Sequence, residues 1–173
     1  IIHRASLLKG VKIAILEEVV REISLNAGAS LLAPTMKKNG AVCYILSGGF
    51  DFFTEKIARQ LGFEGSFSNS IEVKKSKLTG NVIPPILGMN AKLQILLKLT
   101  NKHNVTTDDV VAIGDGANDL KMLKIAGLGI AFNGKPKLKS EIDIQLNNTD
   151  LTGLLFLQGY SIKEIYEHQT AKL

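Results

Sequence analysis

The sequence predicts an α/β fold with a mostly parallel sheet. Two apolar runs, 41–47 and 110–113, are continuous rather than alternating, which is typical of parallel strands covered on both faces. Segments whose apolar residues recur at helical spacing lie around these runs, so strands alternate with helices from residue 29 to residue 132. This order favours parallel strands joined by right-handed crossovers.

Two helices are expected before the first strand. An apolar stripe at helical spacing predicts a helix over 11–24, and a second helix is expected over 29–39, with Gly40 as its left-handed cap. Pro34 lies inside the second helix and should bend it or delay its start. The first helix precedes the alternation of strands and helices, which favours its assignment to a separate attachment.

The middle of the chain predicts a helix, a hairpin and a second helix. The helix after the first strand carries Phe53, Ile57 and Leu61 on one face and should stop at Gly62. Residues 66–82 alternate loosely, with two short β segments around residues 74–77, which indicates a hairpin or flap. A further apolar stripe predicts a helix over 89–100.

The C-terminal part predicts short elements. We expect a strand over 110–113, a helix over 118–126, a strand over 128–132 and an edge strand over 142–146. The sequence from Ser161 to Glu164 matches a capping box that opens the last helix.

Composition narrows the function classes. With 45% hydrophobic and 21% charged residues, the chain is expected to be globular, and its apolar runs are too short to cross a bilayer. The single cysteine, Cys43, lies in an apolar run, which favours a buried structural thiol and a reducing cytoplasm.

The net charge of +5 comes partly from two lysine groups, at 74–77 and 135–139. Aromatic residues do not interleave these lysines, so a solvated surface is favoured over nucleic-acid binding. A milder functional interpretation is a positive potential that attracts an anionic substrate.

The sharpest motif follows the strand at 110–113 and reads Gly-Asp-Gly-Ala-Asn-Asp over residues 114–119. It resembles half of a dinucleotide fingerprint, but Asp119 holds the third glycine position and carboxylates would repel a pyrophosphate. Two carboxylates four residues apart, Asp115 and Asp119, suit a hard cation with oxygen ligands. Simple helix capping is the alternative for either aspartate alone.

Two weaker signals support a phosphate site. Ser47, Gly48 and Gly49 follow the strand at 41–47 and would offer a hydroxyl and N–H groups to an anion at a helix start. Lys92 lies early in the helix expected over 89–100, where the helix dipole mildly disfavours a cation. Alone, each signal is weak; their value lies in their combination with the motif at 114–119.

These motifs, in this order, resemble those of the haloacid dehalogenase superfamily, and within it those of the phosphoserine phosphatase family. The stretches that carry the resemblance are 4–10, 47–50, 78–80, 90–92, 114–119 and 127–133. The resemblance implies a Rossmann-like core over residues 27–173, with a mostly parallel sheet. It also implies a remnant of a helical cap over residues 1–26 and a small β flap at about 66–86.

The resemblance also implies roles for individual residues. Ser47 and Lys92 would hold the phosphoryl oxygens, helped by the N–H groups of Gly48 and Gly49. Asp115 would bind Mg²⁺, and Asp119 would support the metal site and orient Lys92. Two further positions would contact the substrate: Asn118 near the phosphoryl group, and Arg4 paired with the substrate carboxylate.

One motif of the family is absent. None of the aspartates in these 173 residues begins an Asp-x-Asp-x-Thr string, which in the family supplies the nucleophile and the neighbouring general acid. The family places that strand between the strands matched here by 41–47 and 110–113. Because the chain also begins with Ile1, we expect it to be part of a longer polypeptide and to be inactive and poorly folded when expressed alone.

The resemblance implies that the complete protein is a Mg²⁺-dependent phosphatase that converts O-phospho-L-serine to L-serine and phosphate, the last step of serine biosynthesis, through an aspartyl-phosphate. The alternatives are a phosphatase for another small phosphometabolite and a non-catalytic remnant that binds phosphate or a partner. Neither nucleic acid nor a membrane is expected as a partner. The oligomeric state stays open, with a homodimer as one option.

Overall fold

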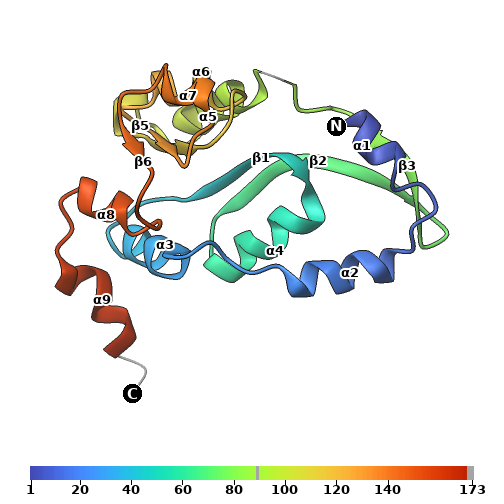
Figure 1. Cartoon of the computed structure of the whole chain (residues 1–173), viewed down its shortest axis with the longest axis horizontal. Helices are drawn as coiled ribbons and strands as arrows, with labels where there is room; N and C mark the ends of the chain where they lie inside the picture. Colours follow the sequence, from blue (N-terminus) through green and yellow to red (C-terminus); the bar gives the residue numbers. More distant parts are fainter. Residues whose placement is uncertain (89, 171–173) are drawn as a thin grey trace. The chain divides into compact units, whose positions relative to one another are not determined.

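The chain divides into two compact units, each with its own sheet (Figure 1). The structure is a computed structural model that describes residues 1–88 and 90–170. Unit 1 comprises Ile1–Leu87 together with Leu155–Leu173, and unit 2 comprises Gly88–Leu154. Parallel strand pairs occur in both units, which confirms the predicted α/β class.

The sheet of unit 1 has the order β1-β2-β3. Strand β1 (Tyr44–Phe50) is parallel to β2 (Gly65–Lys74), and helix α4 (Asp51–Leu61) connects them and packs on both. Strand β3 (Lys77–Ile83) is antiparallel to β2, so the predicted hairpin is present. Both residues of its two-residue turn, Lys75 and Ser76, have positive φ, as a type I′ turn requires.

Strand β1 differs from the predicted run over 41–47, because it begins at Tyr44 and continues to Phe50. Its pairing with β2 is irregular: Leu46 lies opposite Phe67, whereas Phe50 lies opposite Asn69. Three residues of β1, 47–49, therefore face a single residue of β2. The Ser-Gly-Gly sequence forms a bulge within the strand rather than a turn after it, and α4 begins directly at Asp51.

The helices of unit 1 are α1 (Ile2–Ser6), α2 (Ile13–Glu22), α3 (Ala29–Lys38) and α9 (Ile162–Thr170), while α8 (Gly153–Leu157) spans the boundary between the units. Helix α3 runs through Pro34, and Gly40 adopts the predicted left-handed conformation with a φ of 85°. At the start of α9, the Ser161 N–H donates to Glu164 Oε2 and the Glu164 N–H to Ser161 Oγ, which confirms the predicted capping box.

A hydrophobic cluster joins the N-terminal helices to the sheet of unit 1. Its buried members come from α1, α2 and all three strands: Ala5, Leu16, Phe50, Ile71 and Leu78. Backbone bonds reinforce the junction, since the Gly10 N–H donates to the Leu78 carbonyl and the Leu78 N–H to the Val11 carbonyl. Residues 1–11 are thus fastened to strand β3.

The sheet of unit 2 is entirely parallel, with the order β4-β5-β6. Its strands are β4 (Val111–Gly114), β5 (Leu128–Phe132) and β6 (Gln145–Leu146). Its helices are α5 (Ala91–His103), α6 (Leu120–Ile125) and α7 (Pro136–Lys139), with a 3₁₀ turn η1 at Thr107–Asp109. A Cβ on Gly129 would lie 2.0 Å from the Leu123 carbonyl oxygen, so β5 and α6 approach closely only because this residue is glycine.

The strands of the described residues thus form two three-stranded sheets. Among the described residues, β1 pairs only with β2 and β4 pairs only with β5, so each of these apolar parallel strands is an edge. Sequence reasoning, which follows apolar runs, identifies such strands but not their neighbours.

No helix within residues 1–88 and 90–170 has the length and apolar character to cross a membrane.

Candidate functional site

In unit 2, the turn after β4 is organised around the carboxylate of Asp119. This residue retains only 1% exposure. Its Oδ2 accepts hydrogen bonds from the Asp115 N–H (3.2 Å) and the Gly116 N–H (3.0 Å), and its Oδ1 pairs with the ammonium of Lys92. Both carboxylate oxygens of Asp119 therefore have partners, and the two backbone hydrogen bonds stabilise the turn.

Two glycines lie close to the side chains of this turn. A Cβ on Gly114 would lie 2.5 Å from both Cβ and Cγ of Asp119, and a Cβ on Gly116 would lie 2.7 Å from Oδ1 of Asn118. Gly114 is therefore closed to larger residues, because Asp119 is buried and fixed, whereas at Gly116 the exposed Asn118 side chain can turn away. The Lys135 N–H also donates to the Asp115 carbonyl at 2.9 Å, which fastens the turn to the segment after β5.

Lys92 lies in the first turn of α5, and its side chain is 15% exposed. The buried carboxylate of Asp119 fixes the ammonium at this position and offsets the unfavourable helix dipole. The helix is further linked to α6, because Lys121 Nζ donates to Asn90 Oδ1 at 2.9 Å.

Asp115 and Asn118 lie on the same turn and are exposed. Since Lys92 and two N–H groups occupy the Asp119 carboxylate, Asp115 is the carboxylate of this turn that is open to a cation. Within residues 1–88 and 90–170, no group of three or more His, Cys, Asp or Glu side chains could hold a metal ion. Mg²⁺ often uses one or two carboxylates together with water and substrate phosphate, so the single Asp115 carboxylate fits Mg²⁺ as a partial ligand set.

In unit 1, Ser47, Gly48 and Gly49 form the bulge of β1. The Gly49 N–H donates to Ser47 Oγ at 3.0 Å. In this conformation Gly49 therefore holds the serine hydroxyl, and its N–H does not point at an external anion. The hydroxyl hydrogen of Ser47 stays available as a donor because the oxygen serves as the acceptor.

Sequence reasoning missed Asn69, which pins this bulge. Asn69 is 1% exposed and lies on β2 opposite Phe50. Its Nδ2 donates to the carbonyls of Gly48 (3.1 Å) and Gly49 (3.4 Å), and its Oδ1 accepts the Leu87 N–H at 2.8 Å. A polar residue on a strand that alternates only loosely gave no signal of this role.

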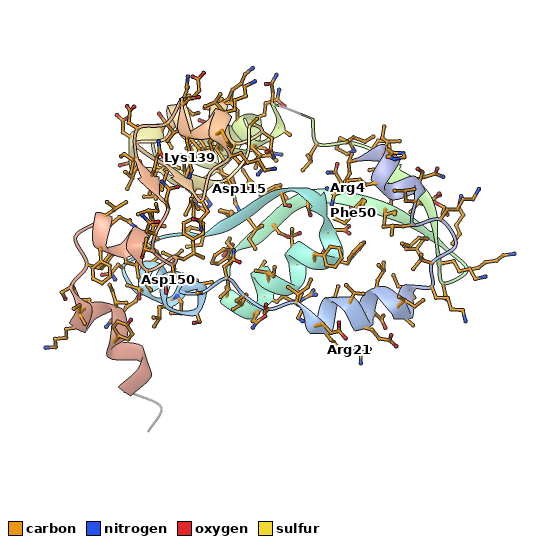
Figure 2. All side chains as sticks on the ribbon, viewed as in Figure 1. Arg4, Arg21, Phe50, Asp115, Lys139 and Asp150 are labelled. Atoms are coloured by element: carbon orange, nitrogen blue, oxygen red, sulfur yellow. The ribbon has the colours of Figure 1, made fainter. Side chains whose placement is uncertain are left out.

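Arg4 is an exposed residue of α1 (Figure 2). Its neighbour Ala5 is fully buried in the same cluster as Phe50, the last residue of β1. The helix that carries Arg4 and the strand that carries Ser47 thus both contribute residues to one hydrophobic cluster.

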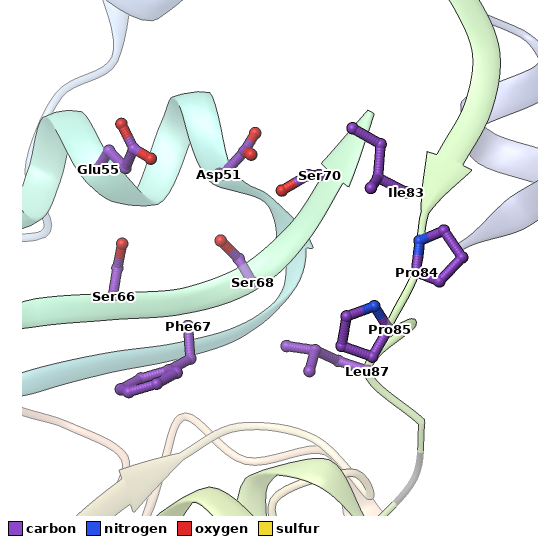
Figure 3. A pocket seen from close by; sticks show the side chains of 10 residues that line it. All are labelled: Asp51, Glu55, Ser66, Phe67, Ser68, Ser70, Ile83, Pro84, Pro85 and Leu87. Atoms are coloured by element: carbon purple, nitrogen blue, oxygen red, sulfur yellow. The ribbon is translucent and has the colours of Figure 1, made fainter. Parts of the chain in front are cut away.

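Unit 1 also has a pocket of about 300 Å³. Ser66 and Ser68 of β2 point toward Asp51 and Glu55 of α4, and Pro84 and Pro85 line the opposite end (Figure 3). None of the predicted site residues lines this pocket.

Cys43 carries the one thiol of the sequence, and a thiol is an alternative nucleophile to a carboxylate. Burial raises the pKa of its thiol, and the nearby Lys37 only partly opposes this effect. A raised pKa keeps the thiol protonated at neutral pH, so Cys43 is not an activated nucleophile.

The sequence profile of haloacid dehalogenase-like hydrolases matches residues 2–124, which include the bulge, Lys92 and the turn at 114–119. The chain belongs to this family. Its relatives include the phosphoserine phosphatases of Methanocaldococcus jannaschii and Archaeoglobus fulgidus, which are 42% and 38% identical to it over 152 residues. The matched region is 88% of this chain in both comparisons.

A solved structure supports the same relationship. The chain is 41% identical to a phosphoserine phosphatase described as a phospho-aspartyl intermediate analogue, with a TM-score of 0.85. The match covers 90% of this chain and 75% of the solved chain. The chain spans 44% of the Archaeoglobus relative and 72% of the Methanocaldococcus relative.

Proposed function

We propose that this chain belongs to a Mg²⁺-dependent phosphatase that converts O-phospho-L-serine to L-serine and phosphate, the last step of serine biosynthesis. The observation that carries the proposal is the Lys92–Asp119 pair on the glycine turn of unit 2. The similarity to phosphoserine phosphatases supports the choice of substrate.

Phosphoryl transfer depends mainly on charge neutralisation and positioning. The Lys92 ammonium is held in one place by a buried carboxylate, so it needs little reorganisation to meet the phosphoryl oxygens. Ser47 would add a hydroxyl donor, oriented by the Gly49 N–H. Asn118 would lie near the phosphoryl group.

Asp115 would hold the cation. Bound Mg²⁺ would neutralise phosphate charge and orient the group that is transferred. Asp115 is suited to this role because its side chain is exposed while its N–H is fixed by Asp119. Asp119 itself would support the site through Lys92 and the backbone of the turn.

Arg4 would select the substrate. O-phospho-L-serine carries a carboxylate beside its phosphate, and a guanidinium can bind a carboxylate through two parallel hydrogen bonds. The exposure of Arg4 supports this role, since an exposed guanidinium can reach a ligand.

The nucleophile would be an aspartate outside the 173 residues, because these residues contain no Asp-x-Asp-x-Thr string. The phospho-aspartyl analogue of the 41% identical phosphatase supports an aspartyl-phosphate intermediate. The edges of β1 and β4 support the presence of a further strand, since each could accept backbone hydrogen bonds.

We also propose a cytoplasmic location, with a homodimer as one option for the oligomeric state.

A second candidate is a non-catalytic protein that binds phosphate or a partner, because Ser47 and Lys92 need no nucleophile to bind phosphate. A phosphatase for another phosphometabolite would keep Lys92 and Asp115 in their roles, but would have no use for a carboxylate partner at Arg4.

The three candidates separate in one set of assays. The assays measure phosphate release in the presence of Mg²⁺, using the protein as its gene encodes it. The substrates are O-phospho-L-serine, an aryl phosphate and sugar phosphates. The proposal predicts a preference for O-phospho-L-serine. Binding of phosphate without turnover of any ester would favour the non-catalytic candidate, and a preference for another ester would favour the third.

A further inference from the structure

Asn69 makes three hydrogen bonds from a fully enclosed side chain. Two carbonyl oxygens and one N–H group surround its amide, so Nδ2 must face the carbonyls of Gly48 and Gly49 and Oδ1 must face the Leu87 N–H. With 1% exposure, water cannot replace these partners. Leaving such groups unpaired would be costly, so the bulge and residue 87 are held together by one side chain.

The bond from Asn69 to the Gly48 carbonyl also fixes a donor. Because the peptide group is planar and trans, the direction of the Gly48 C=O determines the opposite direction of the Gly49 N–H. That N–H donates to Ser47 Oγ at 3.0 Å. A change at Asn69 is therefore passed through one rigid peptide plane to the hydroxyl of Ser47.

We infer that Asn69 is a positioning residue for phosphate binding: it fixes the 47–49 bulge so that the Ser47 hydroxyl points its hydrogen at the phosphoryl group. This inference rests on the proposed function, in which Ser47 binds phosphate. Asn69 does not touch the ligand. It acts through Gly48 and Gly49 and couples them to Leu87, which lies four residues after the end of β3 at Ile83.

Two variants separate the two sides of the amide. Asn69→Asp is isosteric and keeps an acceptor for the Leu87 N–H, but an ionised carboxylate can donate to neither carbonyl, and a protonated one can donate to only one of them. Asn69→Ala removes all three bonds. Ser70→Ala is the matched control, because Ser70 is the next residue of β2, points to the other face of the strand and lines the pocket rather than the bulge.

The measurements are amide hydrogen exchange at Gly49 and Leu87, and the Kd of inorganic phosphate with Mg²⁺ present, on the protein as its gene encodes it. Asn69→Asp should speed exchange at Gly49 and leave Leu87 protected, whereas Asn69→Ala should speed both. Either variant should weaken phosphate binding by about threefold to tenfold, the effect of one lost hydrogen bond. Ser70→Ala should change neither quantity.

Loss of thermal stability with an unchanged phosphate Kd and unchanged exchange at Gly49 would overturn the inference, because Asn69 would then be structural only. If Asn69→Ala does not fold, Asn69→Asp decides the question by the same two measurements. If the unchanged protein binds no phosphate, the proposed function fails. In that case exchange at Gly49 still shows whether Asn69 positions the bulge.

Discussion

Lys92 and Asp119 form an ion pair from which solvent is largely excluded, since their side chains retain 15% and 2% exposure. The pair joins the first turn of α5 to the turn after β4, and Asp119 also accepts two backbone N–H groups. Removing either partner would leave the other charge in a poorly solvated place, which is destabilising.

Asp119→Ala should lower the free energy of unfolding of unit 2 by about 3 kcal/mol. The variant removes the partner of Lys92 and the acceptor of the Asp115 and Gly116 N–H groups. Urea denaturation measures the change in the free energy of unfolding, with NMR signals of residues in unit 2 as the readout. Asp143→Ala is the control, because Asp143 is an exposed aspartate of the same unit. Equal effects of the two variants would contradict the account.

Asp115→Asn should abolish Mg²⁺-dependent turnover and leave the fold intact. The substituted side chain is exposed, and the backbone N–H that donates to Asp119 is retained. Phosphate release from O-phospho-L-serine at saturating Mg²⁺ and thermal unfolding test the two parts of this statement. Near-normal activity at saturating Mg²⁺ would show that the cation binds elsewhere.

Arg4→Ala should impair hydrolysis of O-phospho-L-serine more than hydrolysis of an aryl phosphate, because only the former has a carboxylate to lose. A charge-assisted hydrogen bond contributes on the order of 1.5–3 kcal/mol, so kcat/KM should fall by about tenfold to a hundredfold for O-phospho-L-serine alone. Lys9→Ala, another exposed cation near the N-terminus, is the control. Equal losses on both esters would assign Arg4 a structural role.

Glu72 should make the hairpin sensitive to acid. Hydrogen bonds from Lys74, Asn81 and Thr79 lower the pKa of its carboxyl group to about 2. Because the folded pKa lies below the ordinary value of 4.5, the stabilisation is complete above about pH 4.5 and is lost as the pH falls toward 2.

The test of this pH dependence compares the unchanged protein with Glu72→Gln. Amide exchange over β2 and β3 should be faster in the variant at neutral pH, and the difference should shrink between pH 4.5 and pH 2. Glu64→Gln, at an exposed site before β2, serves as the control. A difference that does not depend on pH would show that the charge of Glu72 is not what holds the hairpin.

The parts of the fold that the sequence predicts are those with a local cause. Gly40 and Gly62 end α3 and α4 in the left-handed conformation that glycine favours, and strand β5 has the predicted bounds, Leu128–Phe132. Helix α1 was not predicted, because five residues are too few to show an apolar stripe.

The bulge in β1 could not be predicted because its cause is not local. Ser-Gly-Gly is common in plain turns, and the register that makes it a bulge is set by Phe50 opposite Asn69 on another strand. The edge positions of β1 and β4 in the described part of the chain depend on strand pairing in the same way. The Lys92–Asp119 contact, in contrast, could be predicted, because the family resemblance implies that Asp119 orients Lys92.

The most direct test of the proposed function is Mg²⁺-dependent release of phosphate from O-phospho-L-serine by the protein as its gene encodes it, compared with its Lys92→Ala variant. The account predicts turnover that requires Mg²⁺ and falls by at least about a hundredfold in the variant, because a fixed charge on the phosphoryl oxygens is lost. No release of phosphate by the unchanged protein, or equal rates for the two proteins, would contradict it.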